Sequence, residues 1–588
     1  MYVICSRAFS LYFLFIMLSF VEYASPQRIL ELLIKERVKI AIKGKMQNVS
    51  PSIAIKKDEQ NASLTIAEQI FLIMPPRDSW CRPHKRERLL DNEKRSNKQI
   101  LTRSIALTIK KHRKTPESHQ YLKKLDAFIA SMRNDIVSKE PLEFNSIRIF
   151  GKKKKVDSDG VTILRPLCIF ESLREKLLIS LASKYLSEVF DPFLHEEILS
   201  YRPLRKYHNS EKPVLTDRDN AIENLQNYRK LHRCRKQNIY VTECDIQKYF
   251  DTINHDVIRE CFSSFVEKIK EQHPQFDYKS VGRIVEAYLN SYSFYKNVVG
   301  ENKRLQKLNP PQRFETPNEE LFIDRGCYTR DEFLASNHKI GIPQGGALSG
   351  LISNVVLSTV DNDSILMGND DNRFFSRYGD DIMLMHTSKE ECSRLITLYC
   401  ETLTKYKLLY HEFISVADEQ FRRNDGKVRP SLWNQKSRSP FLWGRSDNDP
   451  EQIDWIGFLG YEIRYTGEVR LRRSSLNDKF KNIKRKYHTG AKTLIARGEF
   501  KPNGGKTIDN EILNRITKFK GDGSHPLSSA KSLNDNNYCK TQTRKLDLYA
   551  KKWLYRLLYK IAKRNNLTPQ QLQKWWDIAI DGNKAPKK

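Results

Sequence analysis

Two adjacent carboxylates, Asp380 and Asp381, follow a glycine in the middle of a β-favouring segment. Apolar residues stand on both sides of them in residues 374–385, a pattern typical of a hairpin. Gly379 suits the first position of a type II′ turn, because that position needs a positive φ. Adjacent carboxylates at a turn repel each other, and a divalent cation bound to their oxygens removes that cost. A polar hairpin tip without a metal is the alternative, so this turn alone does not decide between them.

Two other segments carry residue types that fit such a cation site. A β-rich run that begins at Gln237 ends at Asp245, and Tyr249-Phe250-Asp251 follows. Residues 339–351 form a glycine-rich loop, Gly341-Ile342-Pro343-Gln344-Gly345, which leads into an apolar helical run at 351–357. A strand end, a glycine-rich loop before a helix and a hairpin turn are all places where polar groups are presented on a rigid scaffold.

In chain order, these three segments resemble the catalytic motifs of reverse transcriptases. Those motifs are a D-x-x-x-(F/Y)-F-D strand end, an I-P-Q-G loop with its helix, and a Y-x-D-D hairpin. Each motif is short, but the three in the right order are specific. The resemblance implies an α+β fold of the right-hand polymerase type, with fingers, a palm of antiparallel sheet plus helices, and a helical thumb. Its implied activity is RNA-directed DNA synthesis.

The resemblance also implies a metal site. Asp245, Asp380 and Asp381 match the family's catalytic carboxylates, and Asp245, Ile246, Asp380 and Asp381 match its metal site. The expected cofactor is Mg²⁺, as two ions, with Mn²⁺ as a substitute. Hard oxygen ligands of this kind suit Mg²⁺.

A nucleotide site is implied in the same way. Residues 161–167 look like the second strand of the family's fingers hairpin, where Arg165 matches an arginine that meets the incoming nucleotide. One of the lysines at 152–155 adds a further charge, and the sequence does not say which. Gln344 and Gly345 match the loop beside the sugar. Phe250 fits the steric gate that excludes a ribose 2′-hydroxyl, although a place in the palm core is the alternative.

Composition favours a polyanionic partner. The 588 residues include 102 Lys and Arg against 71 Asp and Glu, a formal charge of +31. Such an excess points to nucleic acid. The ten cysteines contain no C-x-x-C pair, which argues against zinc and against a secreted disulfide scaffold and fits a reduced cytoplasmic protein. The resemblance, and not the composition, implies the individual partners: an RNA template, a DNA primer and product, and deoxynucleoside triphosphates. No stable membrane association is expected.

The resemblance, together with the pattern of elements, implies four regions. Residues 1–24 are apolar, and Met17 within them is an alternative start, so we expect an over-extended start or a buried helix rather than an export signal. The four predicted regions are a mostly helical extension at 1–145, fingers at 146–235, a palm at 236–465 with an insertion at about 265–338, and a basic helical thumb with a C-terminal extension at 466–588.

The thumb is expected to hold the phosphate backbones of a duplex. The residues assigned to this contact are Arg472, Arg473, Lys484 and Lys486. Residues 455–463 match the F-L-G-Y-x-I strand that closes the family's palm. The family usually has a lysine that protonates the leaving pyrophosphate, and this match fails. The substitutes that the sequence offers are Lys405, Lys407 and His411.

Residues 200–205 resemble the S-Y-G-F-R-P segment of retron and group II intron enzymes, with its G-F pair lost, which points to the prokaryotic branch of the family. The long flanks resemble defence-associated and abortive-infection reverse transcriptases, some of which work with a dedicated non-coding RNA. One alternative is an RNA-directed RNA polymerase, since Gly-Asp-Asp also occurs in those enzymes. Another is a nucleic-acid-binding protein whose polymerase site is vestigial.

Overall fold

The computed structural model describes residues 19–43, 63–84, 87, 89–90, 93–94, 96–202, 217–424, 428–444, 452–496, 537–564, 568–573 and 576. Within these residues the chain forms helices and mainly antiparallel sheets, as an α+β fold requires. Two compact units each collect segments from distant parts of the sequence. The first unit consists of Met1–His208, Asp245–Asn369 and Leu395–His411, and the second of Asn209–Cys244, Asp370–Arg394 and Glu412–Lys588.

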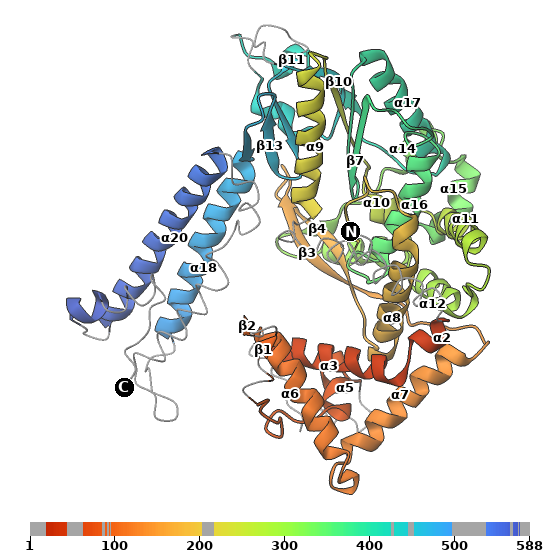
Figure 1. Cartoon of the computed structure of the whole chain (residues 1–588), viewed down its shortest axis with the longest axis vertical. Coiled ribbons are helices and arrows are strands. Elements are labelled where there is room, and N and C mark those ends of the chain that lie inside the picture. Colours follow the sequence, from red (N-terminus) through yellow and green to blue (C-terminus); the bar gives the residue numbers. More distant parts are fainter. Residues whose placement is uncertain are drawn as a thin grey trace, which may run out of the picture. The chain divides into compact units, whose positions relative to one another are not determined.

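A layer of packed helices begins the first unit (Figure 1). Apolar residues at helical spacing in 118–137 predict a helix, and α7 forms there. Its Leu122, Leu125, Ile129 and Met132 are buried, whereas Tyr121 and Phe128 are half-buried. Helix α2 starts at Ser19, which forms a capping box with Glu22, and its Phe20 and Tyr23 are buried. Most of the apolar segment 1–24, including Met17, lies outside the described residues. The elements here are α2 (Phe20–Tyr23), α3 (Pro26–Lys43), α5 (Ile66–Ile73), β1 (Leu89–Leu90), β2 (Glu93–Lys94), α6 (Asn97–His112), η2 (Pro116–Ser118) and α7 (Tyr121–Val137).

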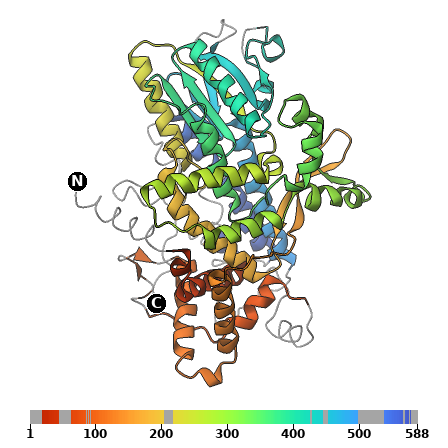
Figure 2. The same cartoon turned by 90° about the vertical axis from the view of Figure 1, so that its right-hand side faces the viewer.

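A long hairpin follows, as predicted: β3 (Arg148–Val156) pairs antiparallel with β4 (Thr162–Ile169). Its turn is closed by Asp157, whose carboxylate accepts hydrogen bonds from two backbone N–H groups of the turn. A third strand, β6 (Gln312–Phe314), pairs parallel with β4. This strand comes from the predicted insertion, so part of that insertion belongs to the hairpin's sheet. Figure 2 shows the insertion helices beside the hairpin.

Helices make up the rest of the first unit. Helix α16 begins immediately after the glycine-rich loop, and most of its residues are buried, as expected for a central helix. The insertion is mainly helical, with a small core of its own around Phe322 and Phe333. The elements are α8 (Leu173–Phe190), η3 (Asp191–Phe193), α10 (Tyr249–Thr252), α11 (His255–Gln272), α12 (Lys279–Asn290), η5 (Tyr295–Val299), α13 (Gly300–Leu305), α14 (Glu319–Asp324), α15 (Arg330–Ser336), η6 (Asn337–Lys339) and α16 (Ser349–Asn362).

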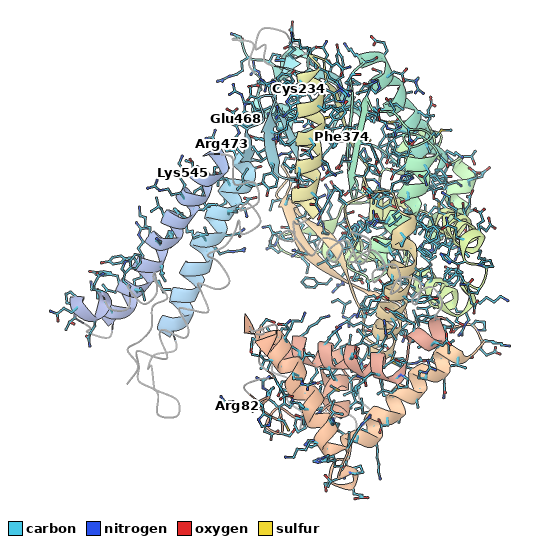
Figure 3. All side chains as sticks on the ribbon, viewed as in Figure 1. Arg82, Cys234, Phe374, Glu468, Arg473 and Lys545 are labelled. Atoms are coloured by element: carbon cyan, nitrogen blue, oxygen red, sulfur yellow. The ribbon has the colours of Figure 1, made fainter. Side chains whose placement is uncertain are left out.

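The second unit is built on a six-stranded sheet with the strand order β11-β10-β5-β8-β7, and β9 also pairs with β10. Pairs β7–β8 and β5–β10 are antiparallel, whereas β9 and β11 run parallel to β10. Helix α9 (Asp217–Cys234) packs on β7 through Tyr228, whose ring centroid lies 5.4 Å from that of Phe374 (Figure 3). The strands are β5 (Tyr240–Asp245), β7 (Arg373–Tyr378), β8 (Asp381–His386), β9 (Phe413–Ile414), β10 (Ser437–Trp443) and β11 (Gln452–Ile453).

The F-L-G-Y segment differs from the expectation. Instead of one strand, it forms a tight hairpin in which β12 (Trp455–Phe458) pairs with β13 (Tyr461–Arg464), and β14 (Val469–Leu471) adds a third strand. Leu459 and Gly460 both have positive φ, +49° and +88°. Two consecutive left-handed residues reverse the chain in a two-residue turn, so a continuous strand is excluded.

The remaining helices are α17 (Lys389–Lys405), η7 (Glu419–Phe421), η8 (Pro430–Asn434), α18 (Arg473–Ala496) and α20 (Asn537–Arg564). Helix α17 ends at Lys405, and Lys407, two residues later, is left-handed with φ +59°. Helices α18 and α20 lie side by side (Figure 1). Thr568 and Gln571 form a capping box. Across the described residues, we find no helix with the length and apolar character needed to span a bilayer.

Candidate active site

The Gly-Asp turn has the geometry that the sequence predicts. Tyr378 pairs with Asp381, so Gly379 and Asp380 form a two-residue turn between β7 and β8. Gly379 has φ +70°, a value that favours glycine. Asp380 is half-buried at the tip, and Asp381 is exposed at the first position of β8. The turn therefore presents two carboxylates in succession.

A buried acid, Glu243 in β5, lies close enough to this turn to interact with it. The carboxylate is paired with Arg438 of β10. Burial raises the pKa of Glu243, the carboxylate of Asp381 raises it further, and the guanidinium groups of Arg438 and Arg472 oppose both effects. Our sequence analysis missed Glu243. The signal was available, because residues two apart on a strand share a face and Glu243 stands two before Asp245.

Asp245 is the last residue of β5, as predicted, and it is 7% exposed. The segment after it pairs with residues 409–411, through the N–H of Gln247 donating to Leu409 at 2.7 Å and a bridge between Ile246 and Tyr410. His411 contacts Asp245 twice. Its N–H donates to the Asp245 carbonyl at 3.0 Å, and its Nε2 lies 3.3 Å from Oδ2.

The three candidate substitutes for the family's lysine have different surroundings. Lys405 lies 3.5 Å from a carboxylate oxygen of Asp363, and Lys407 lies over the ring of Tyr328, with its Nζ 4.5 Å from the centroid. Both lysines are thus engaged by residues outside the three motifs. Of the three, His411 is the one in contact with a predicted catalytic aspartate.

The glycine-rich loop is fixed to α10 by backbone hydrogen bonds. The N–H of Gly341 donates to the carbonyl of Ile253 at 2.7 Å, and the N–H of Ile342 donates to that of Phe250 at 2.8 Å. Gly341 has φ +95°, and a Cβ there would stand 2.8 Å from Cβ of Phe294. Gly345 is also left-handed, with φ +91°. The loop therefore depends on glycine at both positions.

Gln344 joins three parts of the first unit. Its Nε2 donates to Oδ1 of Asp251 at 2.7 Å, and its carbonyl accepts from the N–H of Cys168 at the end of β4 at 3.0 Å. Asp251 is 6% exposed, and burial raises its pKa to about 6. Asp251 was seen in the sequence as part of the motif but was not assigned to the site.

Basic side chains of the β3–β4 hairpin approach the same carboxyl. Lys154 and the exposed Arg165 both lower the pKa of Asp251, against the larger effect of burial. The register also separates the lysines. Lys152 stands directly across from Arg165 on one face of the hairpin, whereas Lys154 Nζ and Lys155 Nζ lie 3.1 Å and 3.8 Å from carboxylate oxygens of Glu315. Lys152 therefore shares a face with Arg165, whereas Lys154 and Lys155 are engaged by Glu315.

Phe250 lies in α10, half-buried, with its ring centroid 5.6 Å from that of Tyr249. Lys248, which precedes α10, is left-handed with φ +46° and donates from Nζ to the carbonyl of Thr316 in the insertion. A half-buried ring fits both a core position and a gate. The role of Phe250 stays a prediction.

The predicted nucleic-acid contacts of the thumb fall into three groups. Arg472 is half-buried, with its guanidinium against Gly457, where a Cβ would overlap it. Arg473 and Lys484 are exposed on α18. Lys486 lies in α18, but its side chain is outside the described part of the chain. Arg473 and Lys484 are therefore the better candidates for a phosphate contact.

No group of three or more His, Cys, Asp or Glu side chains among the described residues is arranged to hold a metal by itself. The donors that the motifs supply are the carboxylates of Asp245, Asp380 and Asp381. These hard oxygens fit Mg²⁺, which usually keeps several waters and takes one or two protein carboxylates together with substrate phosphates. Asp381 also acts on Glu243, whose charge is opposed by Arg438 and Arg472.

The comparisons with known proteins give distant similarities only. No family model and no curated protein matches the sequence. Among solved structures, apo telomerase from Candida tropicalis aligns with a TM-score of 0.35 and 12% identity over 79% of this chain and 67% of that chain. The telomerase of the same organism in complex with a TWJ fragment of telomeric RNA aligns with a TM-score of 0.35 and 13% identity, over 75% of this chain and 62% of that chain. Telomerase from Candida albicans in the corresponding complex aligns with a TM-score of 0.31 and 12% identity, over 79% of this chain and 66% of that chain.

Proposed function

We propose that this protein is an RNA-directed DNA polymerase. One observation carries the proposal: β5, which ends at Asp245, is the neighbour in the sheet of β8, which the Gly379–Asp380 turn precedes. The start of β5 lies by the end of β8. Tyr240 is the first residue of β5, and its carbonyl oxygen is 3.8 Å from Sγ of Cys392, in the helix α17 that follows β8 in the chain. The two strands therefore run in opposite directions, which supports a common edge for their carboxylates.

Asp245, Asp380 and Asp381, with the backbone of Ile246, are the residues that would hold two Mg²⁺ ions. When bound, such ions lower the pKa of a primer 3′-hydroxyl and neutralise charge on the triphosphate and the leaving pyrophosphate. The rigid strand end and the two-residue turn hold the carboxylates in place, so little reorganisation is needed at the moment of reaction.

The nucleotide side of the site is proposed from the first unit. Arg165 and Lys152 face the same way on the hairpin and would meet the triphosphate, since a planar guanidinium binds phosphate with two donors. Gln344 and Gly345 would lie beside the sugar. The hydrogen bond from Gln344 to Asp251 holds the amide in one orientation, which supports a positioning role for this pair.

The remaining assignments are also proposals. The β3–β4 hairpin would be the fingers, the six-stranded sheet with its helices the palm, and α18 with α20 the thumb that contacts a template RNA paired with a DNA primer. A basic excess of this size supports a nucleic-acid partner. Membership of the prokaryotic, defence-associated branch and a dedicated non-coding RNA stay predictions that rest on residues 200–205 and on the long flanks.

The function is tested by primer extension with the full-length protein. An RNA template annealed to a DNA primer is supplied with Mg²⁺ and either deoxynucleoside or ribonucleoside triphosphates. We expect template-dependent incorporation of deoxynucleotides. Preference for ribonucleotides would instead identify an RNA polymerase. Binding without incorporation of either sugar, with RNA or DNA templates, would identify a nucleic-acid-binding protein with a vestigial site.

A further inference from the structure

A buried arginine to which the described residues supply no counter-ion lies in the helical layer before the β3–β4 hairpin. Arg37 of α3 is 3% exposed, and its Nε has no hydrogen-bond partner among the described residues. Its guanidinium carbon lies 4.9 Å from the ring centroids of both Phe71 and Trp80. The aromatic faces attract the cation but accept no conventional hydrogen bond from its Nε, so the burial of this group is only partly compensated.

A second cation, Arg77, adds unfavourable charge close to Arg37. Arg77 lies over the Trp80 ring at 4.4 Å, so two cations share one indole. Burial and the charge of Arg77 both lower the pKa of Arg37, to about 10, and no described carboxylate opposes them. Arg37 therefore stays charged at neutral pH. Buried charges in proteins are normally paired.

The acidic side chains close to these residues in sequence are engaged elsewhere. Glu36, which precedes Arg37 in α3, pairs with Lys39 of the same helix and with Lys176 of α8. Glu68 of α5 closes the capping box with Thr65. Asp78, next to Arg77, accepts a hydrogen bond from the N–H of Ser79 at 3.0 Å. None of these three acids is among the groups that shift the pKa of Arg37.

We propose that Arg37 and Arg77, held by Phe71 and Trp80, form a binding site for a phosphate group. A phosphate offers oxygens to both guanidiniums at once, and charge-assisted hydrogen bonds of this kind are among the strongest that proteins make. The aromatic rings hold Arg37 before the ligand arrives, which reduces the entropy lost on binding. Arg82, two residues after Trp80, is a further exposed cation close in sequence (Figure 3).

The shared ligand chemistry is a phosphate group, and its two sources are a free anion and a nucleic-acid chain. The site belongs to the N-terminal helices and uses none of the three motifs, so it is independent of the polymerase function proposed above. It would give the protein a second contact to RNA or a sensor for free phosphate.

The test uses the full-length protein and two probes, inorganic phosphate and a fluorescein-labelled single-stranded RNA. The first readout is the thermal midpoint in sodium phosphate against sodium chloride at equal ionic strength. The second is RNA affinity by fluorescence anisotropy. The variants are Arg37→Met, which removes the buried charge at similar volume, and Arg77→Ala. The control is Arg113→Ala, which removes an exposed arginine of the same helical layer that pairs with Asp126.

We expect Arg37→Met to abolish the phosphate-dependent rise in midpoint or to weaken RNA binding about tenfold or more. An effect in both readouts, or in phosphate alone, supports a site for a free anion, and an effect in RNA binding alone supports a phosphodiester chain. Arg77→Ala, an exposed change that does not threaten folding, should weaken the same readout several-fold, and Arg113→Ala less than twofold. If Arg37→Met and Arg77→Ala match the wild type in both readouts, the proposal is wrong. Since neither readout requires nucleotide incorporation, its failure is distinct from failure of the proposed activity.

Discussion

The side-chain amide of Gln344 donates a 2.7 Å hydrogen bond to the carboxyl of Asp251, although the two residues are 93 positions apart. The bond connects the aromatic motif after β5 to the glycine-rich loop before α16. One partner of this hydrogen bond can change its charge, because burial raises the pKa of the Asp251 carboxyl to about 6. Two motifs that look independent in the sequence thus share one hydrogen-bonded pair.

The first prediction concerns the catalytic carboxylates. Asp245→Asn and Asp380→Asn should each reduce nucleotide incorporation on the order of a thousandfold, because removal of an anionic ligand weakens the binding of a cation that contributes several kcal/mol to transition-state stabilisation. Single-turnover primer extension with Mg²⁺ as the metal measures the effect. Asp371→Asn, a change at an exposed acid before β7, is the matched control and should retain activity. Wild-type rates in either test variant would exclude this metal site.

The second prediction concerns the sugar. If Phe250 is the gate, the 2′-hydroxyl of a ribose overlaps its ring. An overlap that costs a few kcal/mol gives roughly a hundredfold or greater discrimination against ribonucleotides. Phe250→Val should keep deoxynucleotide incorporation measurable and raise the relative use of ribonucleotides by at least about tenfold. Tyr249→Phe, at the buried neighbour, should leave the preference unchanged. An unchanged preference in Phe250→Val would leave this ring as core packing.

The third prediction follows from the pKa of Asp251. Its folded value, about 6, lies above the ordinary 3.8, because burial disfavours the charged form. Its contribution to the free energy of unfolding is therefore complete below about pH 3.8 and is lost as the pH rises through 6, by at most about 3 kcal/mol. Asp251→Asn should flatten the decline in stability between pH 4 and 7.

The measurement is the free energy of unfolding by denaturant, for the wild type and Asp251→Asn, at several pH values across that range. The asparagine keeps an acceptor for the Gln344 amide, so the comparison isolates the charge. Parallel curves for the two proteins would show that the buried carboxyl keeps an ordinary pKa.

The fourth prediction concerns the exposed basic residues of α18. Arg473→Glu together with Lys484→Glu should weaken duplex binding and reduce the slope of log K against log salt by about one for each phosphate that the variant no longer neutralises. The control reverses the same charge on α7, with Lys123→Glu and Lys124→Glu. Binding isotherms at several salt concentrations provide the slopes. Equal slopes in the two double variants would place the duplex on another surface.

Local chemistry explains what the sequence determined. The Gly379 turn, the β3–β4 hairpin and the stripe of α7 depend on turn residues and periodicity within a short stretch, and all three formed as expected. The F-L-G-Y segment was wrong as a single strand, although Gly460 was a visible turn signal. The turn also needs a positive φ at Leu459, which is uncommon for a leucine, so the residue type at this position did not indicate a turn. The prediction of a single strand therefore followed the resemblance to the family motif.

Tertiary packing decided the surroundings of the site. Glu243 meets Arg438 and Asp381, Gln344 meets Asp251, and Glu315 meets the lysines of β3, and each contact joins segments far apart in sequence. A single sequence shows a residue's type and local period but not which distant group will cover it. Arg37 is the clearest case: in sequence it is one more cation in a basic chain, and only folding places it between two aromatic rings beside a second cation. Burial turns such a charge from a solvated surface group into one that needs an anion, because desolvation acts on the folded environment and not on the residue type.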